Sequence, residues 1–364
     1  MTSRIHQTLL LTLSLLFSTL ACRAATNLIL PPTPPPTLTQ TATPTPLPPT
    51  STPTPIVQSA CPLLLENIMD AATKENAYRT AESNKKTARE QRNRFLVIYS
   101  ISNDTLSTPL YKRVPESLKD EREDRKSHEA IWNYFATLVP YQARKSVTEF
   151  AIMTDGQENI LAGVLQSNEN PAEWTLAIDI LDAKDNHLLT YVFMHELGHL
   201  ITLNADQVPP SERIFENPGD EEIYAQEASA CHQYFPGEGC SQPESYINAF
   251  YNRFWRDLYN EWLEIDKQKD ENEDEYQNML DDFYRTYQDQ FLTDYAVTSP
   301  EEDIAEAWAF FVLSSLPQTY SIAQEKILFF YEYPELIELR QELLSRLCEA
   351  FPTKDNETHL SPSP

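Results

Sequence analysis

The chain has 364 residues, a formal net charge of -27 and a hydrophobic content of 41%. That length can form one large domain or two ordinary ones, and the hydrophobic content is typical of a globular protein. So much negative charge repels a phosphate backbone, and no basic run interrupts it, which argues against nucleic acid as a partner. We interpret the excess of acidic residues as solvated surface.

Residues 1–22 have the pattern of an export signal, with Arg4 near the start and an apolar stretch over residues 9–20. The position of Cys22 after that stretch is typical of a bacterial lipoprotein, in which the cysteine is lipidated and anchors the chain to the membrane at the cell surface. Thr19 departs from the usual lipoprotein pattern, so soluble secretion stays open as the alternative. No other stretch of the sequence is apolar for long enough to cross a membrane.

The proline content marks the next boundaries, because the chain has 27 Pro against 6 Gly. Residues 23–56 are a linker rich in Pro and Thr, and such a composition prefers an extended polyproline conformation. We therefore expect a stiff spacer between the anchor and one folded domain, residues 57–352. Residues 353–364 form a polar tail that needs no structure.

Four cysteines remain once Cys22 is set aside, an even number in a chain predicted to reach an oxidising compartment. We expect two disulfides and favour Cys231 with Cys240, which are close in sequence. The other pair is then Cys61 with Cys348, which lie near the two ends of the predicted domain. A structural zinc site made of cysteines is the weaker alternative, because the sequence has no Cys-x-x-Cys pair.

The first half of the domain has a mixed α and β pattern. Residues 95–99 are a continuous apolar run typical of a buried strand, and residues 116–138 repeat apolar residues at helical spacing. Three further strands are expected at residues 147–153, 160–165 and 174–181, the first two separated by a turn at Asp155-Gly156.

The second half of the domain is predicted to be helical. Apolar residues recur every three or four positions, without strand-like alternation, in the segments 244–267, 275–292, 300–316, 321–331 and 335–348. The aromatic residues of segment 244–267 follow this spacing and are expected in the core. The fold class is therefore α+β, with a small mixed sheet, a buried helix after it and a mostly helical C-terminal half.

The buried helix is predicted at residues 190–203, which are apolar on nearly every side, so their polar side chains need a reason. His195 and His199 are four residues apart and share one helical face, where two imidazoles can bind one zinc ion. Glu196 lies beside them and can act as a general base toward water. The alternative is a core helix whose two histidines are only hydrogen-bonded.

A catalytic zinc site needs a third protein ligand and an open position for water. Thr202 and Ala205 stand where a metzincin has Gly and His, which excludes that class. A glutamate from a later helix is the remaining common solution. The best segment begins at Ser299, a good N-cap, and Pro300, which suits the first helical position.

Two glutamates of this segment, Glu302 and Glu306, are four residues apart on one helical face. With Glu302 on the metal, Glu306 would hydrogen-bond a histidine ligand. In the alternative, Glu302 only caps the helix through a capping box with Ser299, and Glu306 is the ligand. Glu301 and Asp303 are expected to face water or to favour the helix dipole.

His195-Glu-x-x-His199, followed far downstream by Tyr295 and then by Glu302-x-x-Ala-Glu306, resembles the gluzincin catalytic domain of anthrax lethal factor and related secreted zinc metallopeptidases. The resemblance implies a zincin-like fold, a Zn²⁺ cofactor, Glu302 as third ligand, and Tyr295 as a hydrogen-bond donor to the developing oxyanion. It covers two short segments and leaves residues 204–292 without a counterpart, so it does not extend to the substrate.

Together these features predict a zinc-dependent endopeptidase, displayed on the bacterial cell surface, that cleaves a protein or peptide substrate. Strand 174–181 is expected at the sheet edge, where it would pair with an extended peptide. Two alternatives stay open: a catalytically inactive zincin-like domain that binds a partner, and a structural lipoprotein without a metal. His232, inside the predicted Cys231–Cys240 loop, is expected to be an ordinary surface residue. The sequence does not indicate an oligomeric state.

Overall fold

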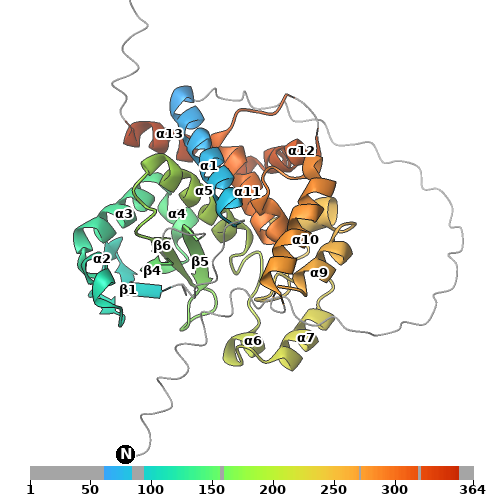
Figure 1. Ribbon diagram of the computed structural model, residues 1–364, viewed down its shortest axis with the longest axis horizontal. Coiled ribbons are helices and arrows are strands. Elements are labelled where there is room, and N and C mark those ends of the chain that lie inside the picture. The colour runs from blue at the N-terminus through green and yellow to red at the C-terminus, as the bar shows by residue number, and fades with distance from the viewer. Residues whose placement is uncertain (1–60, 84–93, 156–159, 270–271, 319–320, 352–364) are drawn as a thin grey trace, which may run out of the picture.

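The computed structural model describes residues 61–83, 94–155, 160–269, 272–318 and 321–351 (Figure 1). The predicted signal with Cys22, the linker 23–56 and the tail 353–364 lie outside the described residues, and so does Gly156 of the predicted turn. Within the described ranges, no helix combines the length and the apolar character that a membrane span requires.

One mixed sheet of six strands forms the first half of the described structure. The strands are β1 (Arg94–Ser102), β2 (Thr105–Leu106), β3 (Leu110–Tyr111), β4 (Val147–Thr154), β5 (Ala162–Gln166) and β6 (Trp174–Asp179). Their order is β2-β1-β4-β6-β5, and β3 also pairs with β1. β4 and β6 are parallel, whereas β1 runs antiparallel to β4 and β5 runs antiparallel to β6. The predicted mixed sheet is thus confirmed.

The prediction that strand 174–181 lies at the sheet edge is wrong. β6 lies between β4 and β5, and all six of its residues are buried, as is typical of an interior strand. β5 forms the edge instead, and every one of its residues is partly exposed. β4 and β5 follow each other in the chain but do not pair, because β6 comes between them.

Two helices, α3 (Arg125–Leu138) and α5 (Asn186–Thr202), pack on one face of the sheet. The ring of Trp132 in α3 lies 5.7 Å from that of Phe150 in β4, and Phe135 lies 5.1 Å from Phe193 in α5. These contacts place α5 inside the main core, where its apolar surface predicted it.

The helix predicted over residues 116–138 is in fact broken. A 3₁₀ turn (Glu116–Leu118) and α2 (Lys119–Glu123) precede α3, and the chain leaves the helical conformation at Asp124. The Asp124 carboxylate accepts hydrogen bonds from the backbone N–H and the hydroxyl of Ser127. An N-cap inside the apolar repeat therefore starts a new helix.

The second half is helical, as predicted. Its α-helices are α6 (Glu212–Glu216), α7 (Glu221–Ala230), α8 (Tyr246–Phe250), α9 (Tyr259–Asp266), α10 (Glu273–Thr286), α11 (Pro300–Leu313), α12 (Ile322–Phe329) and α13 (Pro334–Ala350). The helix predicted over 244–267 is divided by a π turn at Tyr251–Trp255. The aromatic residues Phe250, Phe254, Trp255 and Trp262 of this segment are buried, as expected for the core.

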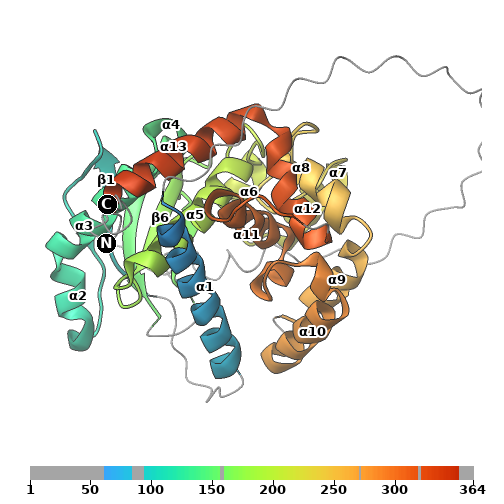
Figure 2. The same ribbon diagram turned by 90° about the horizontal axis from the view of Figure 1, so that it is seen from above.

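Two disulfides join the cysteine pairs predicted from the sequence. Cys231 and Cys240 close a short loop, with their Cα atoms 5.4 Å apart. Cys61 and Cys348 link the start of α1 (Pro62–Ser83) to α13, with their Cα atoms 5.7 Å apart. α1 packs against α5, as Figures 1 and 2 show.

α5 and α11 cross closely and lie side by side in the middle of Figure 2. A Cβ atom on Gly198 of α5 would come within 2.9 Å of the Ala305 Cα atom and 3.2 Å of a Trp308 ring atom. A distance of 2.9 Å to a backbone atom is too short for any side chain. Only glycine at this position allows the two helices to cross so closely.

Gly198→Ala is expected to lower the free energy of unfolding by about 1–3 kcal/mol, because the added methyl group overpacks the crossing. The measurement is urea unfolding of the metal-free protein. Gly163→Ala in β5 is the matched control, since a Cβ there meets nothing within 4 Å. Equal losses in the two variants would contradict the close crossing of α5 and α11.

Candidate metal centre

α5 begins at an N-cap and then runs through the core. The Asp185 carboxylate accepts the backbone N–H groups of His187 and Leu188, and every residue from Leu189 to Thr202 is buried. The exposed fractions of His195, Glu196 and His199 are only 8%, 5% and 8%. Polar side chains at this depth require hydrogen-bonding or metal partners.

α11 brings the second set of polar groups to the same place. Ser299 caps the helix by accepting the Glu302 backbone N–H at 3.2 Å, and Pro300 is its first residue, as predicted. The Glu302 carboxylate does not turn back to Ser299. Its Oε2 atom lies 3.0 Å from His195 Nε2 and 3.4 Å from His199 Nε2. The alternative in which Glu302 only caps the helix is therefore wrong.

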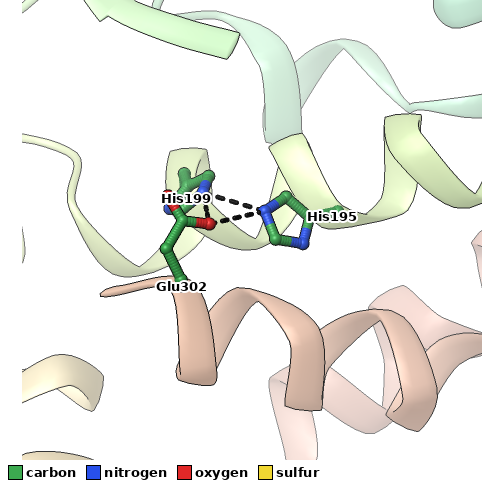
Figure 3. A group of neighbouring side chains, drawn as sticks. All are labelled: His195, His199 and Glu302. Atoms are coloured by element: carbon green, nitrogen blue, oxygen red, sulfur yellow. Dashed lines mark hydrogen bonds and ion pairs between the residues drawn. The ribbon is translucent and has the colours of Figure 1, made fainter. Parts of the chain in front are cut away.

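The three donor atoms form a nearly equilateral triangle, because His195 Nε2 and His199 Nε2 are 3.1 Å apart (Figure 3). A tetrahedral zinc ion with bonds of about 2.0–2.1 Å holds its ligand atoms roughly 3.3 Å from one another. The observed separations of 3.0–3.4 Å fit that requirement. His195, His199 and Glu302 thus form a group that could hold a metal ion.

Glu306 contacts a ligand and stays outside the triangle. Its Oε1 atom accepts hydrogen bonds from His195 Nδ1 at 2.9 Å and from the Tyr191 hydroxyl at 2.8 Å. Its Oε2 atom accepts the Thr293 hydroxyl at 2.7 Å. Only 2% of Glu306 is exposed. This arrangement holds the His195 ring with Nε2 toward the triangle, and it favours Glu302 over Glu306 as the third ligand.

Tyr191 and Thr293 also belong to the site, although neither was predicted from the sequence. Tyr191 stands four residues before His195 on the same face of α5, and this spacing was a usable signal. Thr293 lies in the segment between α10 and α11, and nothing in its local pattern singled it out.

The charges of the site favour a cation. Burial lowers the pKa of His195, but hydrogen bonds and charges from Glu302 and Glu306 outweigh burial and raise that pKa well above 6.5. Burial raises the pKa of Glu302, but the His199 charge and the bonds to both histidines outweigh it and lower the pKa. The histidines and an ionised carboxylate already attract each other, and a divalent ion can replace the protons between them.

Glu196 lies near the sheet edge. Burial raises the pKa of Glu196, and the nearby backbone N–H of Val164 in β5 opposes that rise. Across the described part of the chain, the Glu196 Oε2 atom has no hydrogen-bond partner. The charges of His195, His199 and Glu302 act on this carboxylate, so a base with one available oxygen adjoins the triangle.

Tyr295 lies on the exposed side of the site. It begins a 3₁₀ turn (Tyr295–Thr298) directly before α11, and 41% of its surface is accessible. Its ring centroid is 5.9 Å from that of His195. The structure therefore brings Tyr295 beside the histidines, where a molecule approaching from solvent can meet it.

No protein-family model, curated protein or solved structure matched the chain. The resemblance to the lethal factor-like catalytic domain therefore stays a prediction from sequence. The function must be inferred from the residues of the site.

Glu301 and Asp303 both lie in the first turn of α11, where a carboxylate favours the helix dipole, which was one of the two expectations for them. Glu301 is partly exposed and accepts the Tyr234 hydroxyl at 2.6 Å. The other expectation, that they face water, is wrong for Asp303. Asp303 is fully buried, and its Oδ2 atom lies 2.6 Å from Lys326 Nζ and accepts Trp255 Nε1 at 2.7 Å. These partners come from distant segments of the chain, so local spacing did not reveal them.

The Cys231–Cys240 loop approaches the site through Glu238. Burial raises the pKa of Glu238 from 4.5 to about 7; the nearby Glu301 charge raises it further, whereas the His199 charge opposes the rise. His232 in the same loop is exposed, as predicted for a surface residue.

A second group of carboxylates, Asp155, Asp179 and Asp182, also lies within ligand distance. The oxygens of Asp179 accept backbone N–H groups of Leu181 at 2.8 Å and of Asp155 at 3.0 Å. Because these bonds already satisfy the buried carboxylate, we assign no ion to this group.

The first prediction for the site concerns metal content. The wild type is expected to bind one zinc ion per chain, and Glu302→Ala to lose stoichiometric binding. Glu306→Gln is the matched variant: it should keep the stoichiometry but lose about 10–100-fold in affinity, because Glu306 acts through His195. Elemental analysis and chelator competition measure both. A wild type that binds no zinc would contradict the site.

The second prediction concerns pH and the metal-free protein. Folded Glu238 keeps its proton up to about pH 7, whereas the unfolded chain releases it near 4.5. The folded state therefore binds more protons in this window, and the free energy of unfolding falls as pH rises from 4.5 to 7. Glu238→Gln is expected to reduce that decline in urea unfolding at pH 5 and pH 8. The same decline in both proteins would exclude Glu238 as its source.

Proposed function

We propose that the protein is a zinc-dependent endopeptidase whose ligands are His195, His199 and Glu302. The observation that carries this proposal is the triangle of donor atoms with 3.0–3.4 Å sides, adjoined by a buried carboxylate whose Oε2 atom is available. A metal site alone fits a structural role. A buried carboxylate with an available oxygen beside such a site favours hydrolysis, in which it acts as the general base.

The ligand set supports zinc over other metals. Two imidazoles and one carboxylate in a tetrahedral arrangement are typical of catalytic zinc, and softer or oxygen-preferring ions favour other donor sets. Structural zinc sites usually have four protein ligands. Among the described residues, three gather here. A catalytic site keeps the fourth position for water.

When bound, a zinc ion polarises the scissile carbonyl group and acidifies the attacking water. Glu196 accepts the proton of that water through its available oxygen and transfers it to the leaving amine. Tyr295 approaches from the exposed side and donates a hydrogen bond to the developing oxyanion.

β5 supplies the surface along which an extended peptide would lie. The Ser167 N–H donates to the Glu173 carbonyl, and the Leu161 carbonyl accepts the Asp179 N–H. The backbone groups of these odd-numbered residues, at the two ends of β5, therefore point toward β6. In an antiparallel pair the backbone groups of alternate residues face the other way. The even-numbered groups thus face away from β6, and among them is the Val164 N–H, which lies near enough to Glu196 to lower its pKa. A substrate strand added at this edge would pass beside the triangle.

We place the enzyme outside the cytoplasm. Two disulfides fit an oxidising compartment. The proposal includes the export signal, lipidation of Cys22 and display on the bacterial surface by the Pro/Thr linker, with soluble secretion as the alternative. The zincin-like fold belongs to the same proposal, supported by the order of sheet, ligand helix and helical half.

Glu196→Gln is expected to lower cleavage of a mixed peptide library by about 10²–10⁴-fold, because the general base is lost while the ligands remain. Mass spectrometry of the products and zinc analysis of the same sample measure both effects. Glu212→Gln, at an exposed glutamate of α6, is the control. Undiminished cleavage by Glu196→Gln would reject the mechanism. A zinc-bound wild type without any cleavage would instead support the inactive binding domain.

A further inference from the structure

The Thr293 hydroxyl makes two hydrogen bonds that lead in different directions. It donates to Glu306 Oε2 at 2.7 Å, and it accepts the Ala296 backbone N–H at 3.2 Å. Ala296 follows Tyr295 in the 3₁₀ turn and is fully buried. One side chain thus joins the turn that carries Tyr295 to the carboxylate that orients His195.

The Glu306 carboxylate links Thr293 to His195, because both of its oxygens accept hydrogen bonds. Oε1 accepts His195 Nδ1 and the Tyr191 hydroxyl, and Oε2 accepts Thr293. Because only 2% of the Glu306 surface is exposed, water contributes little to holding its carboxylate. A buried carboxylate that loses one of three donors must move toward the others or leave an oxygen unsatisfied, and both changes disturb the His195 ring.

The turn itself has a second fixed point, on its far side. Trp262 Nε1 donates to the Val297 carbonyl at 3.0 Å, and Val297 is 2% exposed. With the end of the turn held there, the Thr293–Ala296 bond sets the start of the turn. The start is where Tyr295 lies against His195, with ring centroids 5.9 Å apart.

We propose that Thr293 is a positioning residue that couples the placement of Tyr295 to the orientation of the metal ligand His195. One hydroxyl group then adjusts two neighbouring parts of the site, whose ring centroids are 5.9 Å apart. The link to His195 rests on the candidate metal centre, and the link to Tyr295 rests on the proposed function. A purely structural role, in which Thr293 only stabilises the 3₁₀ turn, predicts different results in the experiment below.

The test compares Thr293→Val, which keeps the shape and loses the hydroxyl, with Thr293→Ser, which keeps the hydroxyl. Zinc affinity is measured on the full chain by chelator competition. Thr293→Val is expected to lose up to about tenfold, less than the loss of roughly 10–100-fold expected for Glu306→Gln. Thr293→Ser is expected to bind like the wild type. Thermal unfolding in EDTA checks folding, and Thr293→Ala replaces the valine variant should that variant not fold.

A double-mutant cycle separates coupling from simple stabilisation. If Thr293 acts through Glu306, Thr293→Val causes no further loss of zinc affinity in the Glu306→Gln background. Additive losses, or wild-type affinity in Thr293→Val, would overturn the coupling to His195.

The link to Tyr295 is read from kcat at saturating zinc. Thr293→Val is expected to lower kcat in the wild-type background but not in Tyr295→Phe, where the hydroxyl to be positioned is already gone. An equal loss in both backgrounds would overturn this half. Zinc binding without peptide cleavage would reject the proposed function alone, because the affinity cycle still decides the coupling to His195.

Discussion

The close crossing of α5 and α11 is the constraint on which the site depends. His195, Gly198 and His199 share one face of α5, as i, i+3 and i+4 positions do. Glu302, Ala305 and Glu306 repeat that spacing on α11. In each helix the residue between the two polar groups is small, so the helices touch at the centre of the ligand faces. The crossing that buries the core therefore also brings the histidines within reach of the glutamates.

The rotation of α11 about its axis is fixed by three consecutive acidic residues that point to three partners. Glu301 accepts the Tyr234 hydroxyl, Glu302 meets the histidines, and Asp303 pairs with Lys326. The Asp303–Lys326 pair is buried, and the Lys326 ammonium also lies 3.9 Å from the centre of the Phe291 ring. Leaving either charge alone at this depth is strongly unfavourable, so the pair resists rotation of the helix.

The sequence predicted the parts of the structure that depend on local spacing. The two histidines and Glu196 lie within one helical turn, and Cys231 and Cys240 are nine residues apart. The choice between Glu302 and Glu306 could not be made from sequence, because both lie on one face of α11. In the structure the hydroxyl of Tyr191, 115 residues from Glu306, bonds the Glu306 carboxylate, which lies outside the triangle of donor atoms. The strand order could not be predicted from sequence either. Segments 160–165 and 174–181 both have the pattern of a strand, and neither pattern shows that β6 lies between β4 and β5.

The Cys61–Cys348 disulfide determines how mechanical tension crosses the protein. A pull on the chain preceding Cys61 reaches two routes at that residue: the backbone of α1 and the sulfur bridge to α13. The bridge is covalent, whereas the contact of α1 with α5 is made of packed side chains. Load applied at Cys61 therefore passes directly into α13, and α1 is not peeled from the helix that carries His195.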